Sequence, residues 1–355
     1  MKRIKFLLPI VSLVFVLLFS CSDDDDGVVV VPPRERDEEA VASTLMVEKY
    51  LQTHFYNYEE FENPALDFDY NIVFDTIAGD NASKTPLIEQ VLSKNVNDVN
   101  EDDVTYNLYY LKVRQGEGDE IAFTDIASIT YEGTSLNEKE INDVEDIDGD
   151  GDSEEGIYVY PTNIFDSSVI PVRFDLTQIV KGMQAALSEF NGATGFTENL
   201  DGTLTFEEYG IGAVFIPSGL GYYNEPPPGI DLYSQLIFTF HTYLIEKGDQ
   251  DSDGILSVFE DLNGDGIELN DDTDGNGVPN FADQDDDGDG RLTKNEVVAN
   301  EYIKNSGDPD PELGENEVEM YREITNDETE EITIYTIVFT DENNDGIPDY
   351  LDDQL

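Results

Sequence analysis

The chain has 355 residues, of which 39% are hydrophobic, so it is long enough for two or three compact domains with a sizeable core. It carries 80 Asp and Glu residues against 18 Lys and Arg residues, and the resulting net charge of −62 repels nucleic acid and anionic lipid head groups. One cysteine and two histidines exclude an internal disulfide and leave almost nothing for a zinc site or a histidine-based catalytic triad.

The chain begins with a segment typical of an export signal. In residues 1–21 three cations precede a short apolar run that ends in Ser20 and the lone Cys21. This ending resembles the lipobox of bacterial lipoproteins, which implies lipidation of Cys21; an ordinary signal peptide or a short anchor is the alternative. Asp23–Asp26 resemble an acidic surface-export tag. We therefore expect an outer membrane lipoprotein, periplasm-facing or cell-surface exposed, with a flexible acidic tether at 22–40.

Periodicity after the tether predicts an α+β fold. Apolar residues at helical spacing predict a helix over 38–55, within an N-terminal extension at 41–103. Strands rich in aromatic and β-branched residues are expected at 104–113, 121–123, 127–131, 211–216 and 232–244. A helical run at 176–187 places Leu176, Ile179, Val180, Met183 and Leu187 on one face. One short helix against a mostly antiparallel sheet is the arrangement these elements favour.

Apolar and aromatic residues gather between 161 and 244, with few polar groups among them, which indicates a concave apolar pocket. Six short segments occur between residues 131 and 240 in a fixed order: Tyr131-Glu132-Gly133, Phe165-Asp166-Ser167-Ser168, Pro171–Phe174, Ile179–Met183, Ile216–Tyr222 and Leu236–Phe240. Together they resemble an FKBP-type peptidyl-prolyl isomerase domain over 104–245. The resemblance implies an antiparallel sheet wrapped on one short helix.

The resemblance also implies a set of site residues. The pocket wall would consist of Tyr131, Phe165, Val172, Ile179, Met183, Tyr222, Ile230 and Phe238, with Asp166 as its polar member. The Val180 backbone N–H and the Tyr222 hydroxyl would each hold a substrate carbonyl. Each residue taken alone has a structural alternative. Phe238 and Ile179 would be core residues in any fold, Asp166 could be a turn residue, and Tyr222 could be a surface aromatic.

The chain departs from the family pattern at three places. Met183 stands where the family has a tryptophan floor, Val172 where it often has phenylalanine, and Asp231 follows Ile230 at the rim. The implied activity needs no cofactor, because X-Pro isomerisation breaks no bond and is accelerated by an apolar site that favours the twisted amide. We expect weakened isomerase activity on proline-containing polypeptides; the alternative is a non-catalytic surface binding or adhesion module.

A series of acidic loops follows the last strand, within a region we delimit as 246–300 and a C-terminal segment at 301–355. Two loops, 249–260 and 285–296, fit D-x-[DN]-x-[DN]-G-x5-E, and related loops lie at 261–272, 272–283 and 341–352. The expected calcium ligands are Asp249, Asp251, Asp253, Glu260, Asp261, Asn263, Asp265, Asp272, Asp274, Asn276, Asp283, Asp285, Asp287, Asp289, Glu296, Asp341, Asn343, Asp345 and Asp352.

These loops resemble thrombospondin type-3 repeats, which implies structural calcium in place of a hydrophobic core. A generic acidic linker is the alternative, but it would not repeat one spacing five times. A further acidic insertion at 146–155 predicts either a cation loop or an acidic loop without metal. Beyond the loops we expect a short helix at 297–304 and a strand at 332–339. A purely structural calcium-repeat spacer is the third reading of the whole chain.

Overall fold

The computed structural model describes residues 32–101, 103–141, 157–264, 268–326 and 331–354. The expected signal segment, Cys21, the expected acidic tag and the 146–155 insertion lie outside these ranges. The elements below all belong to the compact unit Glu35–Leu355. Within the described ranges, no helix combines the length and apolar character needed to cross a membrane.

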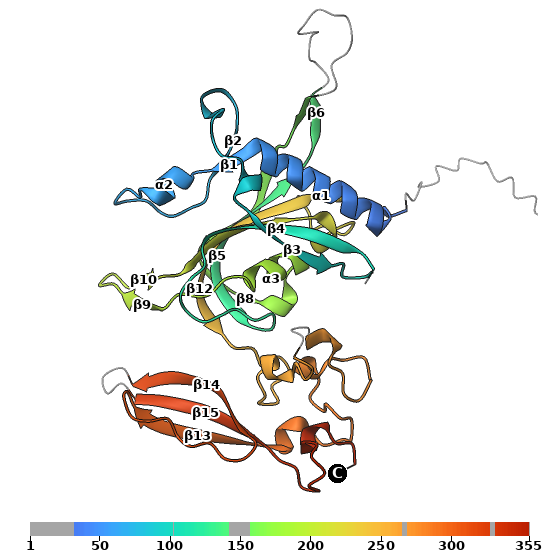
Figure 1. Ribbon diagram of the computed structural model, residues 1–355, viewed down its shortest axis with the longest axis vertical. Coiled ribbons are helices and arrows are strands. Elements are labelled where there is room, and N and C mark those ends of the chain that lie inside the picture. Colours follow the sequence, from blue (N-terminus) through green and yellow to red (C-terminus); the bar gives the residue numbers. More distant parts are fainter. Residues whose placement is uncertain (1–31, 102, 142–156, 265–267, 327–330, 355) are drawn as a thin grey trace, which may run out of the picture. The chain divides into compact units, whose positions relative to one another are not determined.

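The largest sheet among the described residues has six antiparallel strands in the order β3-β4-β11-β12-β5-β8 (Figure 1). Their bounds are β3 Leu92–Asn97, β4 Thr105–Arg114, β11 Gly210–Ile216, β12 Gln235–Glu246, β5 Ile126–Leu136 and β8 Thr162–Asp175. The mixed α/β class with mainly antiparallel strands is therefore as expected. The expected strand at 121–123 is absent from the described elements, because the chain there makes only one isolated bridge, Glu120 to Asn191.

Both faces of this sheet are covered, which explains why β11 is buried along its whole length. Helix α3 (Lys181–Leu187) packs on one face, in a core that includes Met183 and Val214. Helix α1 (Arg36–Thr53) packs on the other through Val47, and Phe215 belongs to that second core. Figure 1 shows the two helices on opposite sides of β3 and β4.

The predicted helix at 176–187 consists of two elements. Asp175 caps a 3-10 turn, η3 (Leu176–Gln178), since its Oδ1 accepts the Thr177 N–H at 2.9 Å. Ile179 and Val180 are extended, and α3 begins at Lys181. Gly182 lets α3 approach β11 closely, because a Cβ at this position would collide with the Ile216 side chain.

Two expected boundaries are wrong. Helix α1 begins at Arg36, inside the expected tether, and Glu39 and Ala40 are already buried. Strand β3, at residues assigned to the N-terminal extension, is an integral edge of the main sheet. The smaller described elements are β1 (His54–Tyr56), α2 (Tyr58–Glu62), β2 (Phe74–Thr76), β6 (Lys139–Ile141), β7 (Ile157–Val159), β9 (Gly195–Glu198) and β10 (Leu204–Glu207).

The expected helix at 297–304 is also wrong. Val297–Asn305 form strand β13, which pairs with β15 (Glu331–Phe339) along its full length. Strand β14 (Glu317–Asn326) pairs with the other edge of β15, giving the order β13-β15-β14. A small core under this sheet contains Leu256 from the first acidic loop, together with Met320 and Ile337. The β-branched and aromatic residues of this segment, Val297, Val298, Tyr302 and Ile303, suit the strand that forms.

Candidate functional site

An apolar cavity of about 220 Å³ opens between α3 and the inner face of the main sheet. Its lining consists of Ile129, Tyr131, Phe165, Asp166, Phe174, Gln178, Ile179, Val180, Met183, Tyr222 and Phe238. Eight of the ten residues that the sequence selected are in this set. Met183 therefore lines the same cavity as Phe165, Tyr222 and Phe238, which is the arrangement the resemblance requires.

The aromatic walls are held edge to face. The rings of Phe165 and Phe238 lie 5.6 Å apart at 87°, and those of Tyr131 and Phe174 lie 5.3 Å apart at 67°. Gly133 makes the first contact possible, because a Cβ here would stand 2.7 Å from Phe238 Cε1 and 2.8 Å from Phe165 Cζ. The glycine of the Tyr131-Glu132-Gly133 segment is thus a packing requirement of the cavity.

Asp166 is the charged residue among the described lining side chains, and its orientation is fixed. The Tyr131 hydroxyl donates to Asp166 Oδ2 at 2.7 Å, and the Ser167 N–H donates to Asp166 Oδ1 at 2.9 Å. Burial, followed by the hydrogen bond to Asp166, raises the pKa of Tyr131 to about 12. Burial and the Asp166 charge likewise raise the pKa of Tyr222. Both hydroxyls therefore remain protonated donors at neutral pH.

Two of the sequence-selected residues do not line the cavity. Val172 is half-buried on β8, two residues before Phe174, and Phe174 lines the cavity in its place. Ile230 is 8% exposed and belongs to the surrounding core. The sequence reading missed Ile129, Phe174 and Gln178; Phe174 could have been found, since the quoted Pro171–Phe174 segment contains it.

A buried polar cluster joins α1 to the loop that carries Tyr222. The Glu39 carboxylate, 2% exposed, accepts hydrogen bonds from Ser43 Oγ and Ser218 Oγ, both at 2.8 Å. The Arg36 guanidinium lies 4.2 Å from the centre of the Tyr223 ring and pairs with Asp98 at 2.7 Å. The N-terminal helix therefore holds this rim of the cavity in place.

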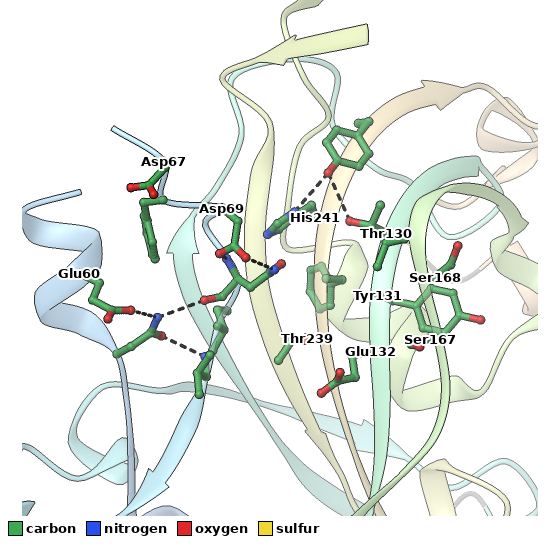
Figure 2. Close-up of a pocket in the computed structure, with 18 of the residues that line it drawn as sticks. Glu60, Asp67, Asp69, Thr130, Tyr131, Glu132, Ser167, Ser168, Thr239 and His241 are labelled. Carbon is green, nitrogen blue, oxygen red and sulfur yellow. Dashed lines mark hydrogen bonds between the residues drawn. The ribbon is translucent and has the colours of Figure 1, made fainter. Parts of the chain in front are cut away.

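A second, more open hollow of about 830 Å³ lies between the 57–73 segment and strands β5, β8 and β12. Figure 2 shows Asp67 and Asp69 on one side of it and His241 and Thr130 on the other. His241 Nε2 lies 2.9 Å from the Tyr70 carbonyl oxygen, and Nδ1 lies 3.2 Å from the Tyr243 hydroxyl. Because both ring nitrogens are engaged and burial lowers the pKa of His241, this imidazole ties the segment to the sheet.

Four acidic loops share one hydrogen bond that the sequence reading did not foresee. The backbone N–H of the second loop residue donates to a side-chain oxygen seven positions later. The pairs are Gln250 with Ser257, Thr273 with Asn280, Asp286 with Thr293, and Glu342 with Asp349, at 3.1, 2.9, 3.2 and 2.8 Å. All four acceptors are at most 1% exposed. Each begins a 3-10 turn, and so the four loops close in the same way.

The two loops with the full spacing bring their carboxylates together. Ligand oxygens of Asp249, Asp251 and Asp253 lie within 4.8 Å of one another, as do those of Asp285, Asp287 and Asp289. Oxygens bound to one calcium ion lie at most about 5 Å apart, because each Ca–O distance is about 2.3–2.6 Å. Glu260 and Glu296, the twelfth residues, are 0% and 3% exposed.

Several of these oxygens are buried and accept no hydrogen bond in the described part of the chain. They are Asp249 Oδ1, Asp251 Oδ2, Asp253 Oδ2, Glu260 Oε1 and Oε2, Asp286 Oδ1 and Oδ2, Asp287 Oδ2 and Asp349 Oδ2. Burial, then the charges of Asp253 and Asp251, raise the pKa of Glu260 to about 10. Unpartnered buried carboxylates of this kind fit a hard divalent cation, whose charge compensates them.

The other loops are more exposed and closed by side-chain amides. Asn276 Nδ2 donates to Asp283 Oδ2 at 2.7 Å, and Asn343 Nδ2 donates to Asp352 Oδ2 at 2.7 Å, so the third or fifth position meets the twelfth. Asn263 Nδ2 donates to Asp271 Oδ1 at 3.2 Å. Asp271 is not one of the expected calcium ligands. Asp261, Asp272 and Asp274 accept backbone N–H groups within their loops, and so do Asp341 and Asp345. Asp265 lies outside the described residues.

Comparisons with known proteins gave one family model and several solved structures. Residues 250–309 match a family model described as BamM C-terminal. No curated protein matches the chain. Similar solved structures include FkpA from Escherichia coli, at 22% identity and a TM-score of 0.26, covering 39% of this chain and 48% of that one. The chain thus spans about half of that protein.

A peptidyl-prolyl cis-trans isomerase from Pseudomonas syringae pv. tomato is similar at 13% identity and a TM-score of 0.30, covering 61% of this chain and all of that one. The N-terminal domain of FKBP42 from Arabidopsis thaliana is similar at 9% identity and a TM-score of 0.26. That match covers 39% of this chain and 87% of that one. TM-scores this low do not establish a common fold, so the functional assignment depends on the cavity residues and not on these neighbours.

Proposed function

We propose that the chain is an FKBP-type peptidyl-prolyl cis-trans isomerase that assists the folding of exported proteins. The observation that carries this proposal is the cavity, in which eight residues selected from the sequence converge. They come from β5, β8, the extended link at 179–180, α3, the Tyr222 loop and β12. A volume of about 220 Å³ suits one small apolar ring such as that of proline.

The reaction needs no general acid, general base or nucleophile. Rotation about an X-Pro bond opposes a barrier of about 18–20 kcal/mol that arises from amide resonance, and no covalent bond is broken. An apolar cavity removes water from the amide and so favours the twisted form, in which resonance and charge separation are lost. Ring walls from Phe165 and Phe238 supply that environment. Met183 completes it with a flexible side chain, which is consistent with reduced activity.

Polar groups at the rim orient the substrate. The Asp166 carboxylate, held by the Tyr131 hydroxyl, faces the cavity and interacts with the dipole of the rotating amide. Tyr222 lies opposite as a protonated donor for a substrate carbonyl. The chain's own residues therefore bind, orient and desolvate the peptide.

The acidic loops bind structural calcium in this proposal. Buried carboxylate oxygens without hydrogen-bond partners in the described residues support it, because burying an unpaired charge costs several kcal/mol unless a cation compensates it. The ion stabilises loops that contain little apolar core, and it takes no part in isomerisation. Lipidation at Cys21 and an outer membrane location, periplasm-facing or cell-surface exposed, complete the proposal on sequence grounds.

A protease-coupled isomerisation assay with a proline-containing peptide tests the function. Asp166→Ala is expected to lower kcat/KM at least about tenfold, which corresponds to about 1.4 kcal/mol. Glu132→Ala is the matched control, since Glu132 is exposed and lies on the same hairpin but faces the other hollow. A wild-type rate no higher than the uncatalysed rate refutes catalysis, and a wild-type rate no higher than that of Asp166→Ala refutes the role of Asp166. Peptide binding without any rate would then favour a non-catalytic binding module.

A further inference from the structure

One carboxylate of the acidic loops stands outside the expected ligand positions. Asp286 is the second residue of the 285–296 loop, yet it is 1% exposed and neither of its side-chain oxygens has a hydrogen-bond partner among the described residues. A ligand oxygen of Asp286 lies within 4.8 Å of ligand oxygens of Asp251 and Glu260 from the first loop. This group therefore joins two loops that are about thirty residues apart in sequence.

We propose that Asp251, Glu260 and Asp286 bind one divalent cation, with calcium as the fitting ion, and that this ion fastens the 285–296 loop to the 249–260 loop. The inference rests on the calcium-binding part of the proposed function and adds a ligand, Asp286, that the twelve-residue spacing does not contain. Asp251 also belongs to the group with Asp249 and Asp253, so the cross-loop site adjoins the site of the first loop.

The oxygens present match what calcium requires. Both Glu260 oxygens, both Asp286 oxygens and Asp251 Oδ2 are buried without partners in the described part of the chain. They can supply up to five of the six to eight oxygen ligands that calcium takes. Arg291, a nearby cation in sequence, is engaged by Glu296 at 3.5 Å. A bound divalent ion is the simplest source of the missing positive charge.

The loop backbones are already held in the geometry that this site needs. Gln284 Nε2 donates to the Asp251 carbonyl oxygen at 2.6 Å, so the two loops touch beside the carboxylates. The Asp286 N–H is fixed by Thr293, as in the other loops. In the first loop the residue at the same position, Gln250, uses its side chain to reach the Thr124 carbonyl oxygen at 2.8 Å. The second loop position thus serves as a connecting point in both loops.

The experiment uses calcium titration and thermal melting of the full chain. Asp286→Asn keeps the shape of the side chain and removes its charge. Glu342→Gln is the matched control, because Glu342 occupies the same position of the 341–352 loop and is exposed. Asp286→Asn is expected to weaken one bound calcium ion at least about tenfold, whereas Glu342→Gln leaves all affinities unchanged.

Melting temperatures with and without calcium show whether Asp286 is a calcium ligand or only a structural residue. In chelator, Asp286→Asn should melt at or above the wild-type temperature, because a buried repulsive charge is gone; in calcium it should melt below wild type. Equal calcium affinities in wild type and Asp286→Asn, or equal losses in both variants, overturn the inference. If Asp286→Asn does not fold, wild-type crystals soaked with calcium provide the test. The inference requires an ion within about 2.6 Å of an Asp286 oxygen, and an ion bound elsewhere in these loops but not there overturns it.

The outcomes also separate this inference from the proposed function. No calcium bound by any variant removes both the cross-loop site and the structural role of calcium, but leaves the isomerase assay untouched. Calcium bound normally by the other loops, with Asp286→Asn unaffected, removes the cross-loop site alone.

Discussion

Glu39 offers a test of whether the N-terminal helix shapes the cavity. The Glu39→Ala substitution removes two hydrogen bonds to a buried carboxylate, from Ser43 and Ser218, and leaves both hydroxyls buried. A hydrogen bond to a charged group contributes about 1.5–3 kcal/mol, and part of this is offset because a buried charge disappears. We expect the free energy of unfolding to fall by about 2–4 kcal/mol.

The same substitution should also weaken substrate binding. Ser218 begins the η4 turn (Ser218–Leu220) that leads into Tyr222. Without Glu39 its hydroxyl keeps Ser43 Oγ as its hydrogen-bond partner among the described residues, at 2.9 Å, so this rim of the cavity is held less firmly. We expect KM for a proline peptide to rise more than kcat falls, since Tyr222 orients the substrate. Denaturant unfolding gives the stability, and the isomerisation assay, run where circular dichroism shows the variant folded, gives the kinetic constants.

Two controls sharpen the result. Glu38→Ala removes one charge from the exposed neighbouring position of α1 and should change neither quantity. Glu39→Gln retains an acceptor oxygen and should restore part of the stability. Wild-type stability in Glu39→Ala refutes the hydrogen-bond reasoning. A destabilised variant with unchanged KM would instead show that the helix supports the fold without positioning Tyr222.

Three further outcomes are expected. Gly133→Ala should cost about 1–3 kcal/mol and abolish most isomerase activity, because its Cβ displaces Phe165 and Phe238; ring-proton shifts in NMR spectra check the displacement. Met183→Ala should destabilise the chain by about 2–5 kcal/mol, since Met183 is 4% exposed, and a small apolar ligand added to the cavity should recover part of that loss. Chelation should lower the melting temperature, with about 2.7 kcal/mol lost per site for calcium at a hundredfold excess over its Kd, and an unchanged transition would contradict bound calcium.

The segments that depend on local pattern were the easiest to foresee. The 38–55 helix and the 104–113, 211–216 and 232–244 strands have clear periodicity or β-branched runs, and each has a matching element in the structure. Strand β13 was missed although Val297, Val298, Tyr302 and Ile303 favour a strand. Its pairing with β15, which lies further along the chain, could not be seen from this segment alone.

The cavity was foreseen as a set, and the errors within it have a local cause. The register between β5 and β8 shifts beyond Ile129, so the residue spacing along β8 does not translate directly into positions around the cavity. Val172 and Phe174 both precede that shift in the pairing, and Phe174, two residues from Val172, is the one that meets Tyr131. Asp286 was missed for a different reason: its role depends on contact between two loops, which no single loop pattern contains.

The order of strands in the main sheet has a consequence for how the chain folds. β4 and β5 follow one another closely in sequence, but β11 and β12 lie between them in the sheet. Strand β4 therefore gains its second neighbour only when β11 pairs with it, as Phe215 does with Tyr109, about a hundred residues earlier in the chain. Chains dominated by such distant pairings fold slowly and leave strand edges open in the meantime. During that interval the high negative charge of this chain keeps unfinished molecules apart, which gives the acidic composition a role in folding.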